Sequence, residues 1–200
     1  MFTQKFLRRN FDGFFDKLMM MIKKLVKSSP KKIEFGCGPN LTSGFVGCDI
    51  RWFPGVQYVC DAWKISSYVN CSVVEEIYSR HFLEHLTFTQ AELTIQSWTK
   101  ILKPSGILRI CVPDIDYHIN QFQSNAWNSP AEANSDWTVY QHAIAGFWGW
   151  QREGDTKLWD VHKSGYNLTI LQLLLEKNGY KNIERIPDQP WNLHIKAIRS

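Results

Sequence analysis

The sequence lacks a long hydrophobic run and any closely paired cysteines. Its longest early apolar run, Leu18–Ile22, is far shorter than the about 18 residues that cross a bilayer. It is also too short for the core of a signal peptide. The five cysteines are an odd number without a C-x-x-C pair, so they indicate neither a disulfide framework nor a thiolate zinc site. We therefore expect a cytoplasmic protein that is neither secreted nor membrane-spanning.

The chain has little net charge, and that charge is unevenly placed. Its formal net charge is +4 over 200 residues. Residues 1–32 hold nine Lys and Arg against Asp12 and Asp16, a balance of +7, so residues 33–200 carry −3. The basic excess is thus confined to the N-terminus. A content of 44% hydrophobic and 21% charged residues is typical of one globular domain of this length.

Residues 1–29 form the first of two predicted units, a basic amphipathic helix. Its apolar residues recur near helical spacing, with Lys and Arg between them: Phe6, Leu7, Phe11, Phe14, Phe15, Leu18, Ile22 and Leu25. One interpretation is a helix that packs on the following domain with its basic residues in water. The other is a peripheral membrane contact, in which residues 1–28 bind anionic lipid or an acidic partner.

Residues 30–200 are predicted to form a single α/β domain. Helical spacing covers residues 88–102 and 168–177, and a turn signal, Lys103–Gly106, follows the first of these. The predicted strands are Lys32–Phe35, Phe45–Cys48, Gln57–Cys60, Val73–Ser79, Ile107–Val112, Tyr180–Ile186 and Leu193–Ile198. Strands that alternate with helices indicate a parallel sheet. The last two strands have no helix between them, which indicates an antiparallel final pair.

A glycine turn follows the first predicted strand. Gly36 and Gly38 lie at the carboxyl end of that strand, which is where an open parallel sheet binds ligands. A glycine lets the backbone approach a ligand that a Cβ would exclude. A dinucleotide fingerprint would have a third glycine where Leu41 stands, and an acidic residue about 20 positions further on. The sequence meets neither condition, so a nicotinamide cofactor is not indicated.

Four stretches in a fixed order extend this pattern. They are IEFGCGPN, VGCDI, CDAW and SRHFLEHL, the last leading through a helix to LKPSGILRICVPD. In this order and spacing, over about residues 30–198, the chain resembles the seven-stranded class I S-adenosylmethionine-dependent methyltransferases, particularly the small type 11 members with glycan-modifying relatives. The resemblance implies an α/β fold with a doubly wound, mostly parallel seven-stranded sheet of Rossmann-like type and an antiparallel C-terminal strand.

The resemblance also implies S-adenosyl-L-methionine as the cofactor. The glycine turn is expected to hold its methionine part, Asp49 its ribose hydroxyls and Asp61 its adenine amino group. Carboxylates suit these tasks, because they accept hydrogen bonds from hydroxyls and attract the cationic sulfonium. The expected cofactor-binding residues are Glu34, Gly36, Cys37, Gly38, Asp49, Ile50, Asp61, Ala62, Trp63 and His81.

The chain departs from the family at the third glycine, which Pro39 and Asn40 replace. Asp49 follows Gly38 by only eleven positions, so the helix between the first two strands must be shortened or missing. This departure keeps open a noncatalytic alternative, in which a methyltransferase-like fold serves as a partner-binding module.

The methyl donor is already activated, so the protein has only to align the acceptor and remove the acceptor's proton. A base is therefore needed near the strand ends. The expected catalytic residues are His81 and His85, after the fourth strand, and Asp114, after the fifth. Each histidine also has a structural interpretation, as a hydrogen-bonding residue. Further titratable residues in these regions are Glu84, Asp116, His142 and His162.

Residues 114–165 form an aromatic-rich insertion on the expected acceptor side. Five of the nine tryptophans lie there, among Asn, Asp and Gln: Trp127, Trp137, Trp148, Trp150 and Trp159. Flat rings beside polar groups suit a sugar, although some rings are expected simply to cover the sheet. Three Lys and Arg against seven Asp and Glu argue against nucleic acid. The expected reaction is O-methylation of a sugar or glycan hydroxyl, with small metabolites, lipids and protein side chains as open alternative acceptors.

The segment His81–His85 also matches H-x-x-E-H, the inverted zinc-peptidase motif. In that alternative, His81 and His85 bind zinc, Glu84 is the base and Glu153 supplies a third ligand. The motif follows a strand and precedes Thr87, a candidate helix cap, rather than lying within a helix. The methyltransferase interpretation is therefore preferred, and no metal site is predicted for it, because no cluster of carboxylates marks one.

Overall fold

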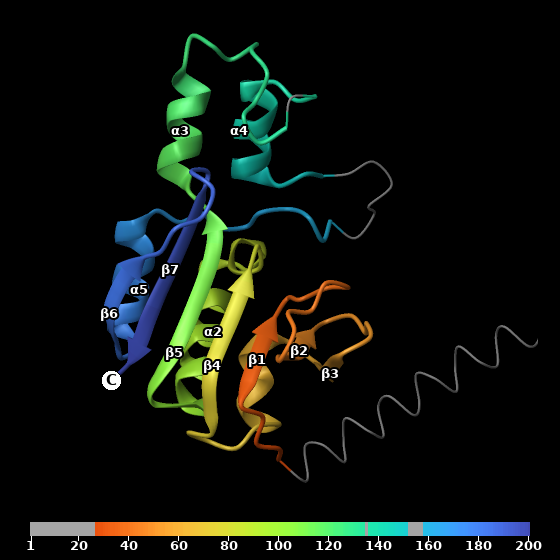
Figure 1. Ribbon diagram of the computed structural model, residues 1–200, viewed down its shortest axis with the longest axis vertical. Coiled ribbons are helices and arrows are strands. Elements are labelled where there is room, and N and C mark those ends of the chain that lie inside the picture. Colours follow the sequence, from red (N-terminus) through yellow and green to blue (C-terminus); the bar gives the residue numbers. More distant parts are fainter. Residues whose placement is uncertain (1–26, 135, 152–157) are drawn as a thin grey trace, which may run out of the picture.

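Seven strands form one sheet in the computed structural model, which describes residues 27–134, 136–151 and 158–200 (Figure 1). The strand order is β3-β2-β1-β4-β5-β7-β6. β7 is antiparallel to both of its neighbours, and the pairs from β3 to β5 are parallel. The mostly parallel sheet with an antiparallel C-terminal strand is thus confirmed. The strands are β1 (Lys32–Phe35), β2 (Val46–Asp49), β3 (Val56–Val59), β4 (Val74–Arg80), β5 (Leu102–Pro113), β6 (Tyr180–Arg185) and β7 (Asn192–Arg199).

Four α-helices and two short 3-10 helices connect the strands within the described residues. They are η1 (Ala62–Ser67), η2 (Leu83–His85), α2 (Phe88–Ile101), α3 (Ile115–Gln123), α4 (Val139–Trp148) and α5 (Leu168–Lys177). The predicted helices over 88–102 and 168–177 are confirmed. Six of the seven predicted strands are confirmed to within one residue at each end. α3 and α4 lie in the aromatic-rich insertion, where the sequence pattern predicts no helix.

The exception among the strands is β5, which begins five residues before the predicted strand. The sequence predicts that a turn at Lys103–Gly106 separates the helix from this strand. That boundary is wrong, because the segment lies inside β5. Val74 pairs with Leu102, and two residues later Glu76 pairs with Ile107. The four intervening residues therefore bulge out of the ladder, which is how the strand accommodates a proline.

The core lies between the sheet and the helices on one of its faces. Ile33 and Phe35 point from β1 toward α2, where the ring of Phe35 lies 4.6 Å from the ring of Trp98. α2 begins at a capping box in which the side chains of Thr87 and Gln90 each accept a backbone N–H of the other. Full burial of one such large apolar side chain stabilises the fold by about 1.5–3 kcal/mol.

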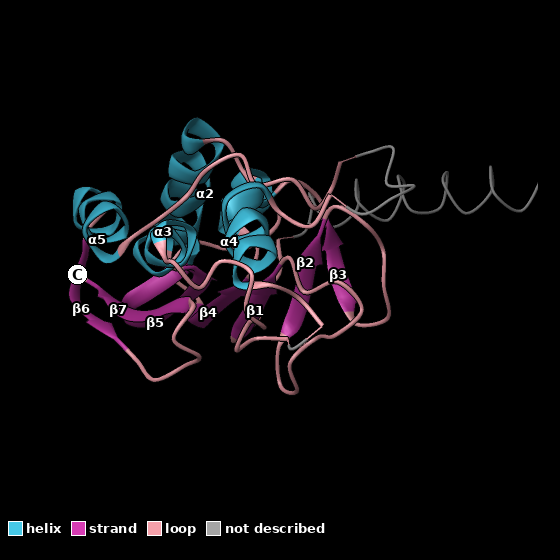
Figure 2. Cartoon of the chain, turned by 90° about the horizontal axis from the view of Figure 1, so that it is seen from above, coloured by secondary structure: helices cyan, strands magenta, loops and turns pink. Residues whose placement is uncertain are grey.

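The described helices that pack on the sheet, α2 and α5, lie on the same face of it (Figure 2). The β1–β2 connection contains turns and no helix, as the short spacing between Gly38 and Asp49 predicts, and the β2–β3 connection also lacks a helix. On the opposite face Glu76 forms ion pairs with Lys32 at 2.7 Å and with Arg109 at 2.5 Å. Charged pairs thus occupy that face in the described part of the chain.

The aromatic-rich insertion extends the molecule beyond the carboxyl end of the sheet, where α3 and α4 lie next to each other (Figure 1). This edge is the one expected to bind ligands. Among the residues described, no helix has both the length and the apolar content to cross a membrane. The predicted N-terminal amphipathic helix falls on residues outside the described part, so both of its interpretations stay predictions.

Candidate active site

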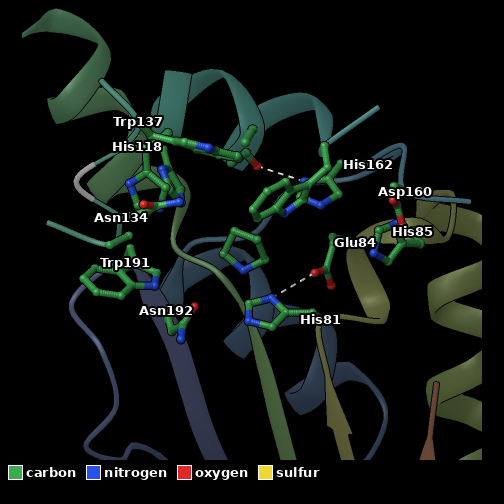
Figure 3. A pocket seen from close by; sticks show the side chains of 16 residues that line it. His81, Glu84, His85, His118, Asn134, Trp137, Asp160, His162, Trp191 and Asn192 are labelled. Carbon is green, nitrogen blue, oxygen red and sulfur yellow. Dashed lines mark hydrogen bonds and ion pairs between the residues drawn. The ribbon is translucent and has the colours of Figure 1, made fainter. Parts of the chain in front are cut away.

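Two cavities open at the carboxyl edge of the sheet. The first, here called the glycine-side cavity, has a volume of about 340 Å³. The second, the histidine-side cavity, has a volume of about 580 Å³ and is lined in part by α3 and α4 (Figure 3). Seven residues predicted to bind the cofactor line the glycine-side cavity: Gly36, Asp49, Ile50, Asp61, Ala62, Trp63 and His81.

Gly36 shapes the glycine-side cavity through its backbone. Its φ of +66° lies in the left-handed region that favours glycine. Its N–H donates to the carbonyl of Cys48 at 2.8 Å, which fixes the turn to β2. A Cβ at this position would collide with the ring of Phe82, which also lines the cavity. The turn therefore requires glycine for packing as well as for conformation.

Asp49 ends β2 with its carboxylate almost buried at the cavity. One carboxylate oxygen accepts the N–H of Gly38 at 3.0 Å, and the other accepts the N–H of Arg51 at 2.8 Å. Nε of Arg51 lies 3.9 Å from the same carboxylate. Because each carboxylate oxygen has two lone pairs, both oxygens keep acceptor capacity for a ligand. The carboxylate of Asp49 is thus held in one orientation and can accept hydrogen bonds from a ligand on both of its oxygens.

Three expected cofactor residues do not line either cavity: Glu34, Cys37 and Gly38. The carboxylate of Glu34 accepts the N–H of Thr42 at 2.6 Å. Burial, with the charges of Asp49 and Glu34, raises the pKa of the Cys37 thiol to about 11. Gly38 acts through its N–H, which holds Asp49. Glu34 and Gly38 thus stabilise the turn through hydrogen bonds, and none of the three residues lines a cavity.

Asp114, one of the three expected catalytic residues, also lies outside both cavities. It is the N-cap of α3, where its side chain accepts the N–H of Asp116 at 3.1 Å. Its other oxygen pairs with Arg185 at 2.9 Å. These contacts anchor α3 to β6 rather than directing the carboxylate at a ligand.

Five of the six histidines line the histidine-side cavity (Figure 3). His81 and His85 flank Glu84 in sequence, and the other three histidines come from α3, from α4 and from the segment before α5: His118, His142 and His162. Glu84 is fully buried, and Nδ1 of His81 lies 3.3 Å from its carboxylate. The sequence gives no sign of this convergence, because its members lie far apart along the chain.

Burial keeps much of this cluster neutral. Burial, together with nearby His142, lowers the pKa of His118 to about 4. Burial also lowers the pKa values of His142 and His162. For Glu84, burial alone would raise the pKa, but the contact with Nδ1 of His81 at 3.3 Å and the electrostatic influence of His81, His85 and His162 lower it. The cavity therefore combines the carboxylate of Glu84 with three imidazoles whose neutral form burial favours, and neutral imidazoles accept protons or bind metal ions.

The two cavities share a wall made of His81, His85 and Asp160. Nδ1 of His85 lies 3.2 Å from the carbonyl of Val161, which fixes the orientation of its ring. Molecules bound in the two cavities would therefore meet at these three side chains.

The whole structure is similar to solved methyltransferase structures. A SAM-dependent methyltransferase from Archaeoglobus fulgidus gives a TM-score of 0.54 at 13% identity, with 92% of this chain and 94% of the other covered. A SAM-dependent methyltransferase from Methanosarcina mazei gives 0.52 at 12% identity, with 89% and 94% covered. The chain has the class I methyltransferase fold. No family model and no curated protein matches the sequence.

In this methyltransferase fold, the tryptophans of the insertion divide into three groups. Trp137 and Trp150 line the histidine-side cavity with ring centroids 4.1 Å apart. Trp159 lines the glycine-side cavity. Trp127 and Trp148 lie outside both cavities and are 53% and 49% exposed. Two of the five tryptophans of the insertion thus form an aromatic part of the histidine-side cavity wall.

Sequence reasoning missed several residues that line the methyltransferase-fold cavities. Trp191, at the end of the β6–β7 connection, and Asn192, the first residue of β7, line the histidine-side cavity. Arg51 and Lys163 bring positive charge to the glycine-side cavity. The available signals were weak: Arg51 directly follows VGCDI, and Trp191 and Asn192 directly precede the last predicted strand but lie outside the insertion.

The H-x-x-E-H segment does not lie on an α-helix of this methyltransferase fold. His81 has a φ of +47° and precedes η2, which is only three residues long. Two histidines on one helix face, which the zinc-peptidase alternative requires, are therefore not formed. Its third ligand, Glu153, lies outside the described residues.

Proposed function

We propose that the protein transfers a methyl group from S-adenosyl-L-methionine to a hydroxyl of a small polar acceptor, with a sugar or glycan as the preferred class. One observation carries this proposal. His81, His85 and Asp160 form a common wall between the cavity at the glycine turn and a second cavity rich in histidine and tryptophan. A methyl donor and an acceptor in these cavities would approach each other at a wall that holds two imidazoles.

The lining of the glycine-side cavity fits this cofactor. Asp49 and Asp61 offer carboxylate acceptors to hydroxyl and amino groups. Ile50 and Trp63 offer apolar surface to a flat base. When bound, the cofactor supplies a methyl group on a positively charged sulfur, and the acidic lining favours that charge. Small-molecule sites typically measure about 300–1,000 Å³, a range that includes this cavity.

His81 and His85 are the residues proposed to remove the acceptor proton. Both line the histidine-side cavity and the shared wall, so a hydroxyl held there is within reach of either imidazole. A neutral imidazole accepts a hydroxyl proton near neutral pH. Asp114 is not proposed for this step, because it is bound to Arg185 and to the start of α3.

The histidine-side cavity favours a polar acceptor with an apolar face. Trp137 and Trp150 supply ring surfaces, and Asn134 and Asn192 supply amide groups beside them. Sugars present C–H faces to such rings and hydroxyls to such amides. The buried carboxylate of Glu84 makes the same cavity unfavourable for a phosphate backbone.

The test is methyl transfer from methyl-labelled S-adenosyl-L-methionine to a panel of monosaccharides, oligosaccharides, phenols and nucleosides. Label incorporated into a sugar supports the proposal, and label in another acceptor only would overturn its sugar class. His85→Ala is expected to keep cofactor affinity and slow transfer, whereas Asp49→Ala is expected to abolish cofactor binding.

The same assays separate the alternatives. Binding of the cofactor without transfer to any acceptor would favour the noncatalytic module. Hydrolytic activity with stoichiometric zinc and no cofactor affinity would favour the zinc hydrolase.

A further inference from the structure

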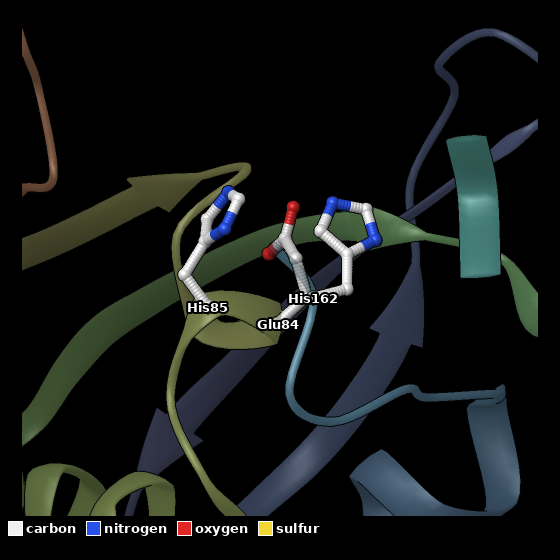
Figure 4. Close-up of side chains that lie close together, drawn as sticks. All are labelled: Glu84, His85 and His162. Atoms are coloured by element: carbon white, nitrogen blue, oxygen red, sulfur yellow. The ribbon is translucent and has the colours of Figure 1, made fainter. Parts of the chain in front are cut away.

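A glutamate and two histidines form a compact group at the histidine-side cavity (Figure 4). One potential ligand atom from each of Glu84, His85 and His162 lies within 4.8 Å of the other two. Glu84 and His85 belong to η2, and His162 comes from the segment before α5. The three side chains lie close together, and the two imidazole rings meet edge to face with centroids 5.0 Å apart. We propose that these three residues form a binding site for one divalent transition-metal ion, with zinc as the representative ion.

The backbone fixes the hydrogen positions on both rings. Nδ1 of His85 lies 3.2 Å from the carbonyl of Val161, and Nδ1 of His162 lies 2.9 Å from the carbonyl of Gly146. A carbonyl oxygen only accepts, so each Nδ1 carries the proton and each Nε2 keeps a lone pair. Histidines that bind metals typically donate their second nitrogen to a carbonyl or carboxylate in this way.

Glu84 supplies the second, independent observation. Its side chain is 2% exposed, and neither carboxylate oxygen has a hydrogen bond within the described residues. The side-chain nitrogen paired with it, Nδ1 of His81, is 3.3 Å from one carboxylate oxygen. A buried carboxylate without hydrogen bonds is costly, and a bound cation would compensate that cost.

The geometry and ligand types suit zinc. Tetrahedral zinc with ligands at about 2.1 Å separates those ligands by about 3.4 Å, so binding would draw the group slightly together. Two histidines with one glutamate form a common catalytic zinc set that leaves a coordination position open. Manganese, iron, cobalt and nickel accept the same nitrogen and oxygen donors.

A second group of titratable residues, Cys111, Asp188 and His194, is also compact. There, however, the guanidinium of Arg80 donates to both oxygens of Asp188, at 2.8 and 3.2 Å. A cation is therefore already present, and a metal ion would be repelled. No comparable guanidinium or ammonium group faces Glu84 among the described residues.

The inference deepens the proposed function and rests on it. A metal ion beside His85 would lie next to the shared wall, and its open position would receive an acceptor hydroxyl. Coordination lowers the pKa of a bound hydroxyl, and the proton would then pass to the imidazole of His81. His85 would thus act as a ligand and His81 as the base.

The test measures metal binding directly, without cofactor or acceptor. Chelator-treated protein is titrated with zinc by calorimetry and with cobalt by visible absorption. We expect one ion per chain and a cobalt spectrum of tetrahedral type. Glu84→Gln and His162→Gln should each weaken zinc affinity by more than about 10-fold. His118→Gln and His142→Gln, in the same cavity but outside the group, should change it by less than about 3-fold, because neither residue is a ligand.

The outcomes separate this inference from the proposed function. Absence of zinc binding, or equal losses in all four variants, would overturn the metal site even if S-adenosylhomocysteine binds. Metal binding with the expected pattern but no affinity for S-adenosylhomocysteine would overturn the proposed function and keep the metal site. If Glu84→Gln fails to fold, the zinc affinity of His162→Gln still tests the metal site.

Discussion

The backbone N–H of Gly38 donates to the carboxylate of Asp49 at 3.0 Å. This bond joins the glycine turn after β1 to the end of β2 across a connection that contains no helix. Arg51 holds the second oxygen of the same carboxylate. The chain therefore fixes the orientation of Asp49 through two neighbouring backbone amides, although the connection between the strands is short.

Asp49→Asn should weaken S-adenosylhomocysteine binding strongly. The substitution keeps the shape of the side chain but removes a charged acceptor, and hydrogen bonds to charged groups contribute about 1.5–3 kcal/mol, or about 10- to 100-fold in affinity. Asp114→Asn is the matched control, because Asp114 is an equally buried strand-end carboxylate outside both cavities. Calorimetry of both variants is the measurement, and equal losses of affinity would contradict the assignment of Asp49.

Gly36→Ala should reduce both stability and cofactor affinity more than Gly38→Ala. Both glycines have positive φ, at +66° and +53°, so both substitutions add backbone strain of about 1–2 kcal/mol. A Cβ on Gly36 would also displace Phe82 from the cavity wall, whereas a Cβ on Gly38 meets nothing within 4 Å. Urea unfolding and calorimetry test the ranking, and a larger loss for Gly38→Ala would reverse it.

Gly146→Ala should impair the histidine-side cavity and leave cofactor binding intact. Gly146 lies on α4 against the ring of His118, and a Cβ there would overlap that ring. Overpacking of this kind typically costs about 1–3 kcal/mol. We expect a lower thermal midpoint and slower methyl transfer with unchanged S-adenosylhomocysteine affinity. A fall in that affinity would indicate that the two cavities are not separable.

The free energy of unfolding should fall as the pH drops from about 6.5 to about 4. Burial lowers the pKa of His118 from 6.5 to about 4, so in this range the unfolded chain binds a proton that the native chain does not. His118 thus contributes stability above its unfolded pKa and loses it on acidification, by up to about 3 kcal/mol. His142 and His162 act in the same direction.

Urea unfolding at several pH values measures this effect. His118→Gln should flatten the dependence between pH 4 and pH 6.5, because glutamine does not titrate there. A variant that retains the full slope of the native protein would show that another group is responsible.

The strands and the long helices could be predicted from local pattern. Ile33 and Phe35 alternate with Lys32 and Glu34 before Gly36, and residues 88–101 repeat apolar side chains at helical spacing after the cap Thr87. Such elements bury one face against a neighbour, so their period appears in the sequence. The turn at Lys103–Gly106 was mispredicted, because a bulge and a turn use the same residues.

The histidine-side cavity could not be predicted in the same way. His162 follows Glu84 by 78 positions, and only the folded chain brings them together. α3 and α4 bury polar residues such as His118 and Gln121 between them, so they carry a weak apolar period. The glycine-side cavity was easier to predict, because its main residues follow consecutive strands and therefore meet at one edge.

The most direct test of the account is calorimetric titration of the purified full chain with S-adenosylhomocysteine. The account predicts one site per chain with micromolar affinity, weakened about 10- to 100-fold in Asp49→Asn and retained in Asp114→Asn. The absence of any saturable heat, or an affinity that Asp49→Asn leaves unchanged, would contradict the central claim that the cavity at Gly36 and Asp49 binds this nucleoside cofactor.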